Sequence, residues 1–476
     1  MAPNKTLIRK GFLWTAAERF SSQLVLFVIG IIIARLVTPS EYGILGILMV
    51  FINISQVFID SGLGSALIYE NKIEKDSLQT IFSFNLFVSL LLYLLLFFAA
   101  PLIESFYNLP KLSLYLRISA LVLCTNSFIV VPTAVLKIRL DLRSLAIANF
   151  TSSILSGLLG VFMAWKGLGV WALIGQLLSK SVFLLLLITI SSKVFPILYF
   201  RIETFKRLFK YGVNIFGATC ITKIVDEGIY FVIGKVLTPF GLGIYTRGNQ
   251  FASLPGNSMN SIMSSVLFPS LSSIKDNRKD FNSLYIKGLE VQSLICFPLF
   301  FFLAMAAFPL IRLLLTEKWI AVVPILQVLC IGRAFAPIAY VAEQAINAAG
   351  RSDLFLKQQI VKLIVKFVFV AFAIPFGLIA IAIADAVATA FQVFITNYFA
   401  RPINIESLKG QLKIAFPYAI SAIISSTAGF FASRLINSDL VSVLTALSIA
   451  FIIYVSCLIL VFGKKDKLAY LIKRKI

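Results

Sequence analysis

The stretch RLVTPSEYGIL at residues 35–45 returns as KVLTPFGLGIY at residues 235–245. A basic residue, the Thr-Pro pair and a Gly-Ile pair occupy the same relative positions in both copies. A weaker echo matches the Gly-Leu pair at residues 167–168 to the one at residues 377–378. Chance can explain either match alone. Both fall at equivalent places in two successive series of apolar segments, however, and this predicts an internal repeat.

The apolar segments are long enough to cross a membrane. Hydrophobic residues make up 59% of the 476 residues and charged residues only 13%, whereas about a quarter of the residues in soluble proteins are charged. Runs of about 20 apolar residues, the length that an α-helix needs to span a bilayer, recur along the chain, and residues 320–346 form one of them. We therefore predict an all-α integral membrane protein with about 14 transmembrane helices. A soluble enzyme is excluded.

The repeat organises these helices into bundles. We predict one six-helix bundle over residues 1–200, a second over residues 201–405, and two additional helices with a basic tail over residues 406–476. Because six is even, both bundles enter the membrane from the same side and form a parallel repeat about a pseudo-twofold axis along the membrane normal. Such a pair of bundles is an alternating-access scaffold.

The net charge of +22 is explained mainly by the orientation of the chain in the membrane. Most Lys and Arg residues lie in alternate loops, and cytoplasmic loops carry this excess, so both termini are predicted to be cytoplasmic. Attraction to anionic lipid headgroups accounts for the charge as well, and we expect no nucleic-acid partner.

Several kinds of chemistry are excluded or not expected. The chain has no histidine, which excludes histidine-ligated metal sites and Ser-His-Asp catalysis. The five cysteines are scattered in apolar stretches and suggest neither a disulfide nor a metal cluster. The loops are too short for the outer catalytic domain of a glycan polymerase or ligase. We expect no enzymatic activity, cofactor or bound metal.

Ionisable side chains nevertheless recur inside the predicted helices, where each costs about 2.5–3.5 kcal/mol on insertion scales. They are Glu18, Arg19, Asp60, Lys180, Lys223, Asp226, Glu227, Glu290, Arg333, Glu343, Lys362, Lys366 and Asp385. In the first two helices of each predicted bundle the polar residues line one helical face. Two interpretations stay open: the charges pair with one another, as Lys223 and Glu227 can at a spacing of four residues, or they surround a water-filled cavity between the bundles.

The turn at residues 37–43 and its copy at residues 237–243, the Asp-Ser-Gly-Leu-Gly segment at residues 60–64 and the fourteen predicted helices resemble one family. It is the polysaccharide-transport or O-antigen (Wzx-type) flippase family of the multidrug/oligosaccharidyl-lipid/polysaccharide exporter superfamily. The resemblance implies a flippase in the bacterial inner membrane for surface polysaccharide biosynthesis. Its substrate would be an undecaprenyl-pyrophosphate-linked oligosaccharide, moved to the outer leaflet by alternating access. It also implies a groove for the prenyl tail on the two additional helices, with residues 419–431 contributing.

A pyrophosphate-linked glycan requires cations for its phosphates and hydrogen-bonding groups for its hydroxyls, and Arg suits bidentate phosphate contacts. The predicted substrate-binding residues are Arg19, Arg247, Lys223, Lys180, Arg333, Asn53, Gln56, Gln250, Asn257 and Asn260.

Directional flipping needs an energy source, and the sequence has no Gly-x-x-x-x-Gly-Lys-Ser/Thr nucleotide-binding motif. We therefore predict secondary transport, driven by an H⁺ or Na⁺ gradient or by the membrane potential acting on an anionic substrate. The candidate ion-coupling acids are Asp60, Asp226, Glu227 and Asp385, each of which could serve instead as a salt-bridge partner. The expected partners are the lipid-linked oligosaccharide and membrane lipids, and the protein is expected to act as a monomer. A cation-coupled multidrug exporter of the same superfamily is the alternative function.

Overall fold

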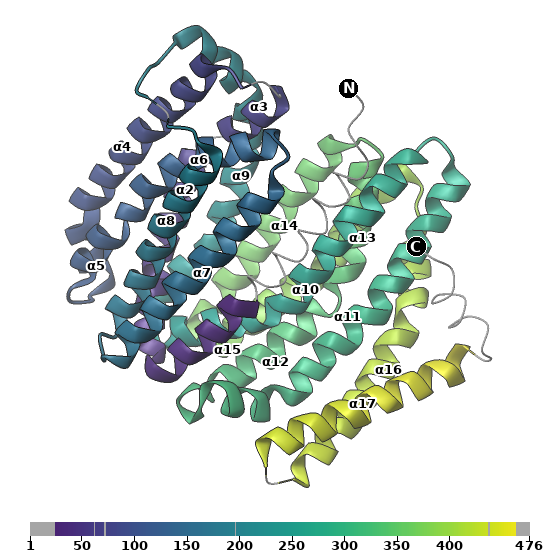
Figure 1. Cartoon of the computed structure of the whole chain (residues 1–476). Coiled ribbons are helices and arrows are strands. Elements are labelled where there is room, and N and C mark those ends of the chain that lie inside the picture. The colour runs from purple at the N-terminus through teal and green to yellow at the C-terminus, as the bar shows by residue number, and fades with distance from the viewer. Residues whose placement is uncertain (1–23, 61, 71–72, 196, 437, 463–476) are drawn as a thin grey trace. The chain divides into compact units, whose positions relative to one another are not determined.

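The computed structural model describes residues 24–60, 62–70, 73–195, 197–436 and 438–462, and helices dominate the described chain (Figure 1). The chain divides into two compact units, one that runs through Gly243 and one that starts at Ile244. The prediction of an all-α membrane protein is confirmed at this level.

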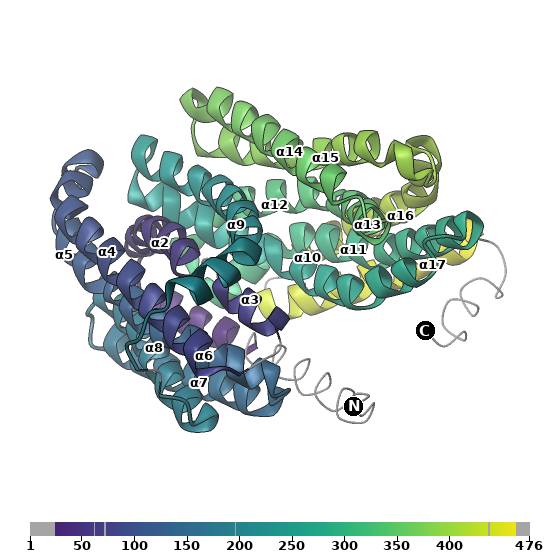
Figure 2. The same ribbon diagram turned by 90° about the horizontal axis from the view of Figure 1, so that it is seen from above.

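Within the described residues, the first unit contains a short helix, eight numbered helices and the first turn of a ninth. They are Leu24–Leu36, α2 (Pro39–Asp60), α3 (Leu63–Glu70), α4 (Lys75–Tyr107), α5 (Leu112–Ser119), α6 (Leu121–Ile138), α7 (Leu142–Trp165), α8 (Val170–Ser192), α9 (Ile202–Val236) and the start of α10 (Pro239–Ser273). Helix α2 packs along α9, and α8 packs against both α6 and α7 (Figure 2). Small residues let these helices approach closely, as is usual inside membranes. A Cβ added to Gly160 of α7, for example, would lie 2.9 Å from the Cβ of Gln176 on α8.

The repeated Thr-Pro motif begins a helix in each copy. Thr38 directly precedes α2, and both its backbone nitrogen and its Oγ1 donate to Glu41 Oε2 at 2.7 Å. The backbone nitrogen of Glu41 donates back to Thr38 Oγ1 at 3.3 Å, which completes a capping box. In the second copy, Gly241 donates its backbone N–H to Thr238 Oγ1 at 3.3 Å. The motif is therefore a helix start, in which Thr caps the helix and Pro occupies the first helical position.

The two copies of the motif also touch each other. A Cβ on Gly43 would overlap the backbone carbonyl of Pro239, and a Cβ on Gly243 would overlap the backbone carbonyl of Pro39. The first turns of α2 and α10 thus cross at backbone contact, and the contact is reciprocal. Glycine is required at both positions because any side chain would occupy the space of the opposing carbonyl.

The second unit continues α10 and adds seven α-helices and three short 3₁₀ turns within the described residues. They are α11 (Arg278–Leu315), η1 (Glu317–Trp319), α12 (Val322–Arg333), α13 (Ala336–Ala348), α14 (Ser352–Ala373), η2 (Ile374–Phe376), α15 (Leu378–Ala400), η3 (Arg401–Ile403), α16 (Leu408–Arg434) and α17 (Asp439–Phe462). Helix α11 packs against α16, α17 and α12, and α14 lies beside α15 (Figures 1 and 2). The largest fully buried side chains of this unit include Trp319, Tyr285 and Phe297.

Equivalent turns connect two of the helix pairs. Gly167 precedes α8 with φ of 75°, and Gly377 precedes α15 with φ of 86°. Both values lie in the left-handed region that glycine occupies without strain. Each turn of the weaker sequence echo thus contains a glycine with positive φ, but Gly377 is the N-cap of α15, whereas Gly169 rather than Gly167 is the N-cap of α8.

Ten helices of the described chain are long and apolar enough to cross a membrane. Helices α9 and α10, with 35 residues each, are long enough but carry the polar stripes and are not among the ten. Residues 1–23, where the first predicted helix begins, lie outside the described residues. A total of fourteen spans stays a prediction.

One predicted helix is broken. The single span expected over residues 320–346 consists of α12 and α13, which meet at an angle of 43°. Pro337 stands at the start of α13, where its missing N–H costs nothing, whereas inside a continuous helix it would remove a hydrogen bond. The proline explains why a continuous apolar run folds as two helices.

Candidate functional site: a polar pocket in the first unit

Asn53, Gln56 and Asp60 form a polar stripe along the face of α2 that contacts α9 and α6. Asn53 Nδ2 donates to Glu227 Oε1 of α9 at 2.9 Å. Farther along α2, Gln56 Nε2 donates to Asp60 Oδ1 at 3.1 Å. The predicted stripe residues Asn53, Gln56 and Asp60 therefore all form polar contacts, the first two half-buried and Asp60 at the exposed end of α2.

The stripe extends into a network that reaches α6 and α8. Asn126 Nδ2 donates to Gln56 Oε1 at 2.8 Å, and Ser181 Oγ donates to Asn126 Oδ1 at 2.6 Å. Thr125 and Ser181 share a further hydrogen bond of 2.6 Å between their hydroxyls. An amide at the centre of such a chain has few alternative rotamers, because its oxygen and its nitrogen are both engaged.

This network forms one side of a pocket with a volume of about 440 Å³. Its polar lining residues come from α2, α6 and α9 and are Gln56, Asp60, Asn126, Thr133, Lys137 and Thr219. Val57, Ile129, Val130 and Phe216 contribute apolar walls. The Oγ1 of Thr133 is buried and makes no hydrogen bond within the described part of the chain. The pocket therefore offers carboxylate, amide, hydroxyl and ammonium groups within a helical bundle, a mixture suited to a polar ligand.

Glu227 is a buried acid of α9 that contacts the polar stripe of α2. It is only 5% exposed, and besides the hydrogen bond from Asn53 its Oε1 lies 4.0 Å from Lys223 Nζ. The local pairing of Lys223 with Glu227, one of the two interpretations of the stripes, is confirmed. A carboxylate buried to this extent needs such partners, because an unpaired charge is costly in low dielectric.

The predicted arginines of the second unit contact neighbouring side chains. Arg247 is 5% exposed, donates from Nη1 to Gln250 Oε1 at 2.7 Å and lies 5.8 Å from the ring centre of Trp319. Arg333 donates to the side chain of Asn249 and, at 2.6 Å, to Ser253 Oγ. These contacts orient both guanidinium groups.

Two further charged pairs in the second unit join different helices. Lys366 Nζ of α14 lies 2.9 Å from Asp385 Oδ1 of α15, and Tyr245 donates its hydroxyl to Asp385 Oδ2 at 3.1 Å. Lys362 pairs in the same way with Glu343 of α13. Asp385, predicted as an ion-coupling acid, is thus already neutralised by a lysine. These four side chains form ion pairs, as the pairing interpretation predicts, and the ion-coupling role of Asp385 stays a prediction.

The remaining predicted residues are more dispersed. Asn260 accepts a hydrogen bond from Gln292 Nε2 at 3.2 Å, Asn257 is exposed on α10, and Lys180 is half-buried on α8. Arg19 lies outside the described residues, and so does the side chain of Asp226. Among the described residues, no group of three or more Cys, Asp and Glu side chains is placed to hold a metal.

The sequence analysis did not predict five polar residues of the pocket or its network: Thr125, Asn126, Thr133, Lys137 and Ser181. Asn126 could have been identified from the sequence, because an amide in the middle of an apolar helix requires a hydrogen-bond partner. Thr133 and Ser181 could not have been identified in this way, since hydroxyl groups commonly donate to the carbonyls of their own helix.

The family model described as "polysaccharide biosynthesis protein" matches residues 32–324. The chain belongs to this family. Among curated relatives, the succinoglycan biosynthesis transport protein ExoT of Rhizobium meliloti is 24% identical over 69% of this chain and 67% of its own length. The lipopolysaccharide biosynthesis protein WzxC of Escherichia coli is 23% identical over 70% of this chain and 68% of its own length. The resemblance inferred from the Thr-Pro motif is confirmed, and the protein is a multi-pass membrane protein of a transporter family rather than of an enzyme class.

Solved structures share the fold. The lipid II flippase MurJ, in its inward closed conformation, is 17% identical, covers 95% of this chain and 100% of its own chain, and has a TM-score of 0.78. An inward-facing multidrug resistance MATE family transporter of the MOP superfamily is 15% identical, with a TM-score of 0.63 over 82% of this chain and 96% of its own. At these identities the similarity establishes the fold alone.

Proposed function

We propose that this protein flips an undecaprenyl-pyrophosphate-linked oligosaccharide across the bacterial inner membrane by alternating access. The polar pocket of the first unit carries the proposal. A phosphate-bearing sugar head cannot enter hydrocarbon without a large cost in free energy, so a protein that moves it must offer a hydrated, hydrogen-bonding path. The pocket supplies Lys137 for a phosphate and Gln56, Asn126 and Thr133 for hydroxyls.

The predicted topology gives the pocket a role in loading. Loop charges place the end of α2 at Asp60 and the end of α6 at Lys137 on the cytoplasmic side. A lipid-linked glycan is presented there before it is flipped. The pocket would receive one part of the glycan head, because its volume of about 440 Å³ lies within the roughly 300–1,000 Å³ of ordinary ligand sites.

Asp60 is the acid that we propose for ion coupling. Asp385 pairs with Lys366, and Glu227 with Lys223, so each would have to give up a cation before it bound another. Asp60 instead accepts its hydrogen bond from the neutral amide of Gln56 and lines the pocket directly. The charges of Lys137 and of a bound substrate phosphate would change the affinity of this carboxylate for a proton or Na⁺. Binding and release of the substrate would thereby be coupled to binding and release of the ion.

The alternative function is cation-coupled export of drugs, and the fold shared with a multidrug transporter supports it. Vesicles that contain the purified protein separate the two functions. We expect translocation of a defined lipid-linked oligosaccharide, dependent on an H⁺ or Na⁺ gradient, and no gradient-driven movement of a lipophilic cationic dye. Dye movement without glycan translocation would favour the exporter.

Asp60→Asn tests the coupling acid in the same vesicles. This substitution preserves the shape of the side chain and removes its charge, so the gradient should no longer accelerate flipping. Asp276→Asn, in the exposed loop before α11, is the matched control and should behave as wild type. Gradient-dependent flipping by Asp60→Asn would remove Asp60 from the coupling mechanism and leave the flippase assignment standing.

A further inference from the structure

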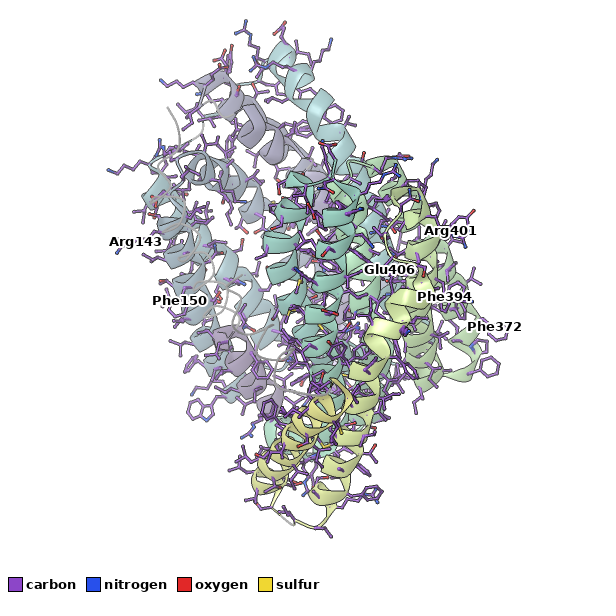
Figure 3. All side chains as sticks on the ribbon, turned by 90° about the vertical axis from the view of Figure 1, so that its right-hand side faces the viewer. Arg143, Phe150, Phe372, Phe394, Arg401 and Glu406 are labelled. Atoms are coloured by element: carbon purple, nitrogen blue, oxygen red, sulfur yellow. The ribbon has the colours of Figure 1, made fainter. Side chains whose placement is uncertain are left out.

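The second unit contains a larger groove, with a volume of about 780 Å³, formed by α15, η3 and the start of α16. Its residues belong to the second unit alone. Figure 3 shows Phe394, Arg401 and Glu406 together on this side of the molecule. The groove has an aromatic wall and a charged end.

The wall is a stripe of exposed aromatic side chains on α15. Phe391, Phe394 and Tyr398 lie at spacings of three and four residues, on one helical face. They are 43%, 52% and 62% exposed, and the ring centres of Phe391 and Phe394 are 5.6 Å apart. The stripe runs along about two turns of helix and offers a continuous apolar surface to a hydrocarbon chain.

The charged end holds two cations. Arg401 follows α15 directly, with its guanidinium 5.1 Å from the ring centre of Tyr398. Lys409 stands in the first turn of α16 and lines the same groove. Neither side chain forms an ion pair among the residues that the structure describes.

One acid shares this end of the groove. Glu406 Oε1 accepts hydrogen bonds from the backbone N–H of Ser407 at 3.2 Å and from its hydroxyl at 3.4 Å. Its carboxylate is therefore directed to the start of α16 and stabilises that helix end. Arg401 and Lys409 against Glu406 leave one net positive charge, which a single phosphodiester would neutralise.

We propose that this groove binds one anionic phospholipid of the cytoplasmic leaflet. The phosphodiester lies between Arg401 and Lys409, and one acyl chain follows the aromatic stripe. The loop after residue 400 falls on the predicted cytoplasmic side, where anionic lipids and basic protein segments attract each other. Binding here would anchor the α15–α16 corner to the leaflet, and the inference does not depend on the proposed flippase function.

A photoreactive phosphatidylglycerol tests the site on the full-length protein in vesicles. We expect its crosslinks to map to peptides that contain residues 391–413, at a yield at least fivefold above that of the matching phosphatidylcholine probe. Excess unlabelled phosphatidylglycerol should suppress the crosslinks, and excess phosphatidylcholine should not. Equal labelling by both probes would overturn the proposal without the need for any variant.

Variants locate the two parts of the site. Arg401→Gln/Lys409→Gln should lower the phosphatidylglycerol crosslink at least fivefold. Lys275→Gln/Lys279→Gln removes the same charge from exposed positions around the start of α11, also on the predicted cytoplasmic side, and should lower it little. Phe394→Ala should weaken crosslinking by both probes. Equal losses in the two double variants would reduce the effect to surface charge. Stronger competition by a polyprenyl phosphate than by phosphatidylglycerol would assign the groove to the carrier lipid instead and overturn the proposal.

Discussion

At the scale of single residues, the charged side chains of the interior pair either within one helix or between two helices. Lys223 and Glu227 could be paired from their spacing, because both lie on one helix. Lys366 with Asp385 and Lys362 with Glu343 join different helices, and no local pattern specifies such partners. The same limit applies to Asn126, whose contact with Gln56 exists only after α2 and α6 pack.

The Asp385–Lys366 pair gives a prediction about stability. Asp385 is 2% exposed, so Lys366→Met should leave a buried carboxylate with reduced compensation and cost about 3–5 kcal/mol. The double variant Asp385→Asn/Lys366→Met should lose much less, because it removes both charges. Chemical or thermal unfolding of the purified proteins measures the difference. If the double variant lost as much unfolding free energy as the single variants Lys366→Met and Asp385→Asn combined, the ion pair would not be the stabilising unit.

Asn126 gives a prediction about transport. Asn126→Ala removes the donor to Gln56 Oε1 and the acceptor of Ser181, so glycan flipping should fall at least tenfold while stability changes by about 1–3 kcal/mol. Asn149→Ala is the matched control, because among the described residues the side-chain nitrogen of Asn149 donates to the carbonyl of Leu145 in its own helix and to no other helix. Similar flipping rates in the two variants would separate the network from transport.

At the scale of helices, the sequence predicted the repeat of the Thr-Pro motif but not that its copies touch. Matching letters reveal a shared local structure, here a capped helix start, whereas contact depends on how α2 and α10 cross. The break between α12 and α13 was missed for a different reason. Hydropathy averages over the run and does not register the single proline, Pro337, that ends one helix and starts another.

The glycine crossing predicts strong intolerance to a single methyl group. Gly43→Ala should force α2 away from the carbonyl of Pro239 and destabilise the protein by about 1–3 kcal/mol or more, with loss of flipping. Gly241→Ala, on α10 two residues before Gly243, is the matched control: a Cβ there would meet Leu237 Cβ at an ordinary 3.4 Å, so it should be neutral or stabilising. Melting temperatures of the two variants decide the matter, and a Gly43→Ala protein as stable as wild type would disprove the close crossing.

At the scale of the whole molecule, composition was sufficient to predict an all-helical membrane protein, and ten described helices are apolar enough to span the bilayer. It was insufficient for the full number of spans, because α9 and α10 combine the length of a span with the polarity of a pocket wall. Hydropathy is weakest for such helices, since the polar residues that serve transport reduce the average on which it depends.

Topology is testable at this scale without any substrate. Loop charges predict that a reporter fused after Ile476 is active in the cytoplasm. A reporter placed in the turn at Gly167, between α7 and α8, should be active outside the membrane barrier, because five predicted spans separate it from the N-terminus. A fusion after Ile476 that reads as external would reverse the assignment of both the pocket and the lipid groove to the cytoplasmic side.

The central claim is that the polar pocket of the first unit receives the head of a lipid-linked glycan. The most direct measurement places a photoreactive amino acid at position 133, in the pocket, and in a control protein at position 158, which is 61% exposed on α7. With a radiolabelled lipid-linked oligosaccharide in vesicles, we expect crosslinks to the sugar from position 133 and not from position 158. Labelling of the sugar from both positions alike, or from neither while flipping proceeds, would contradict the account.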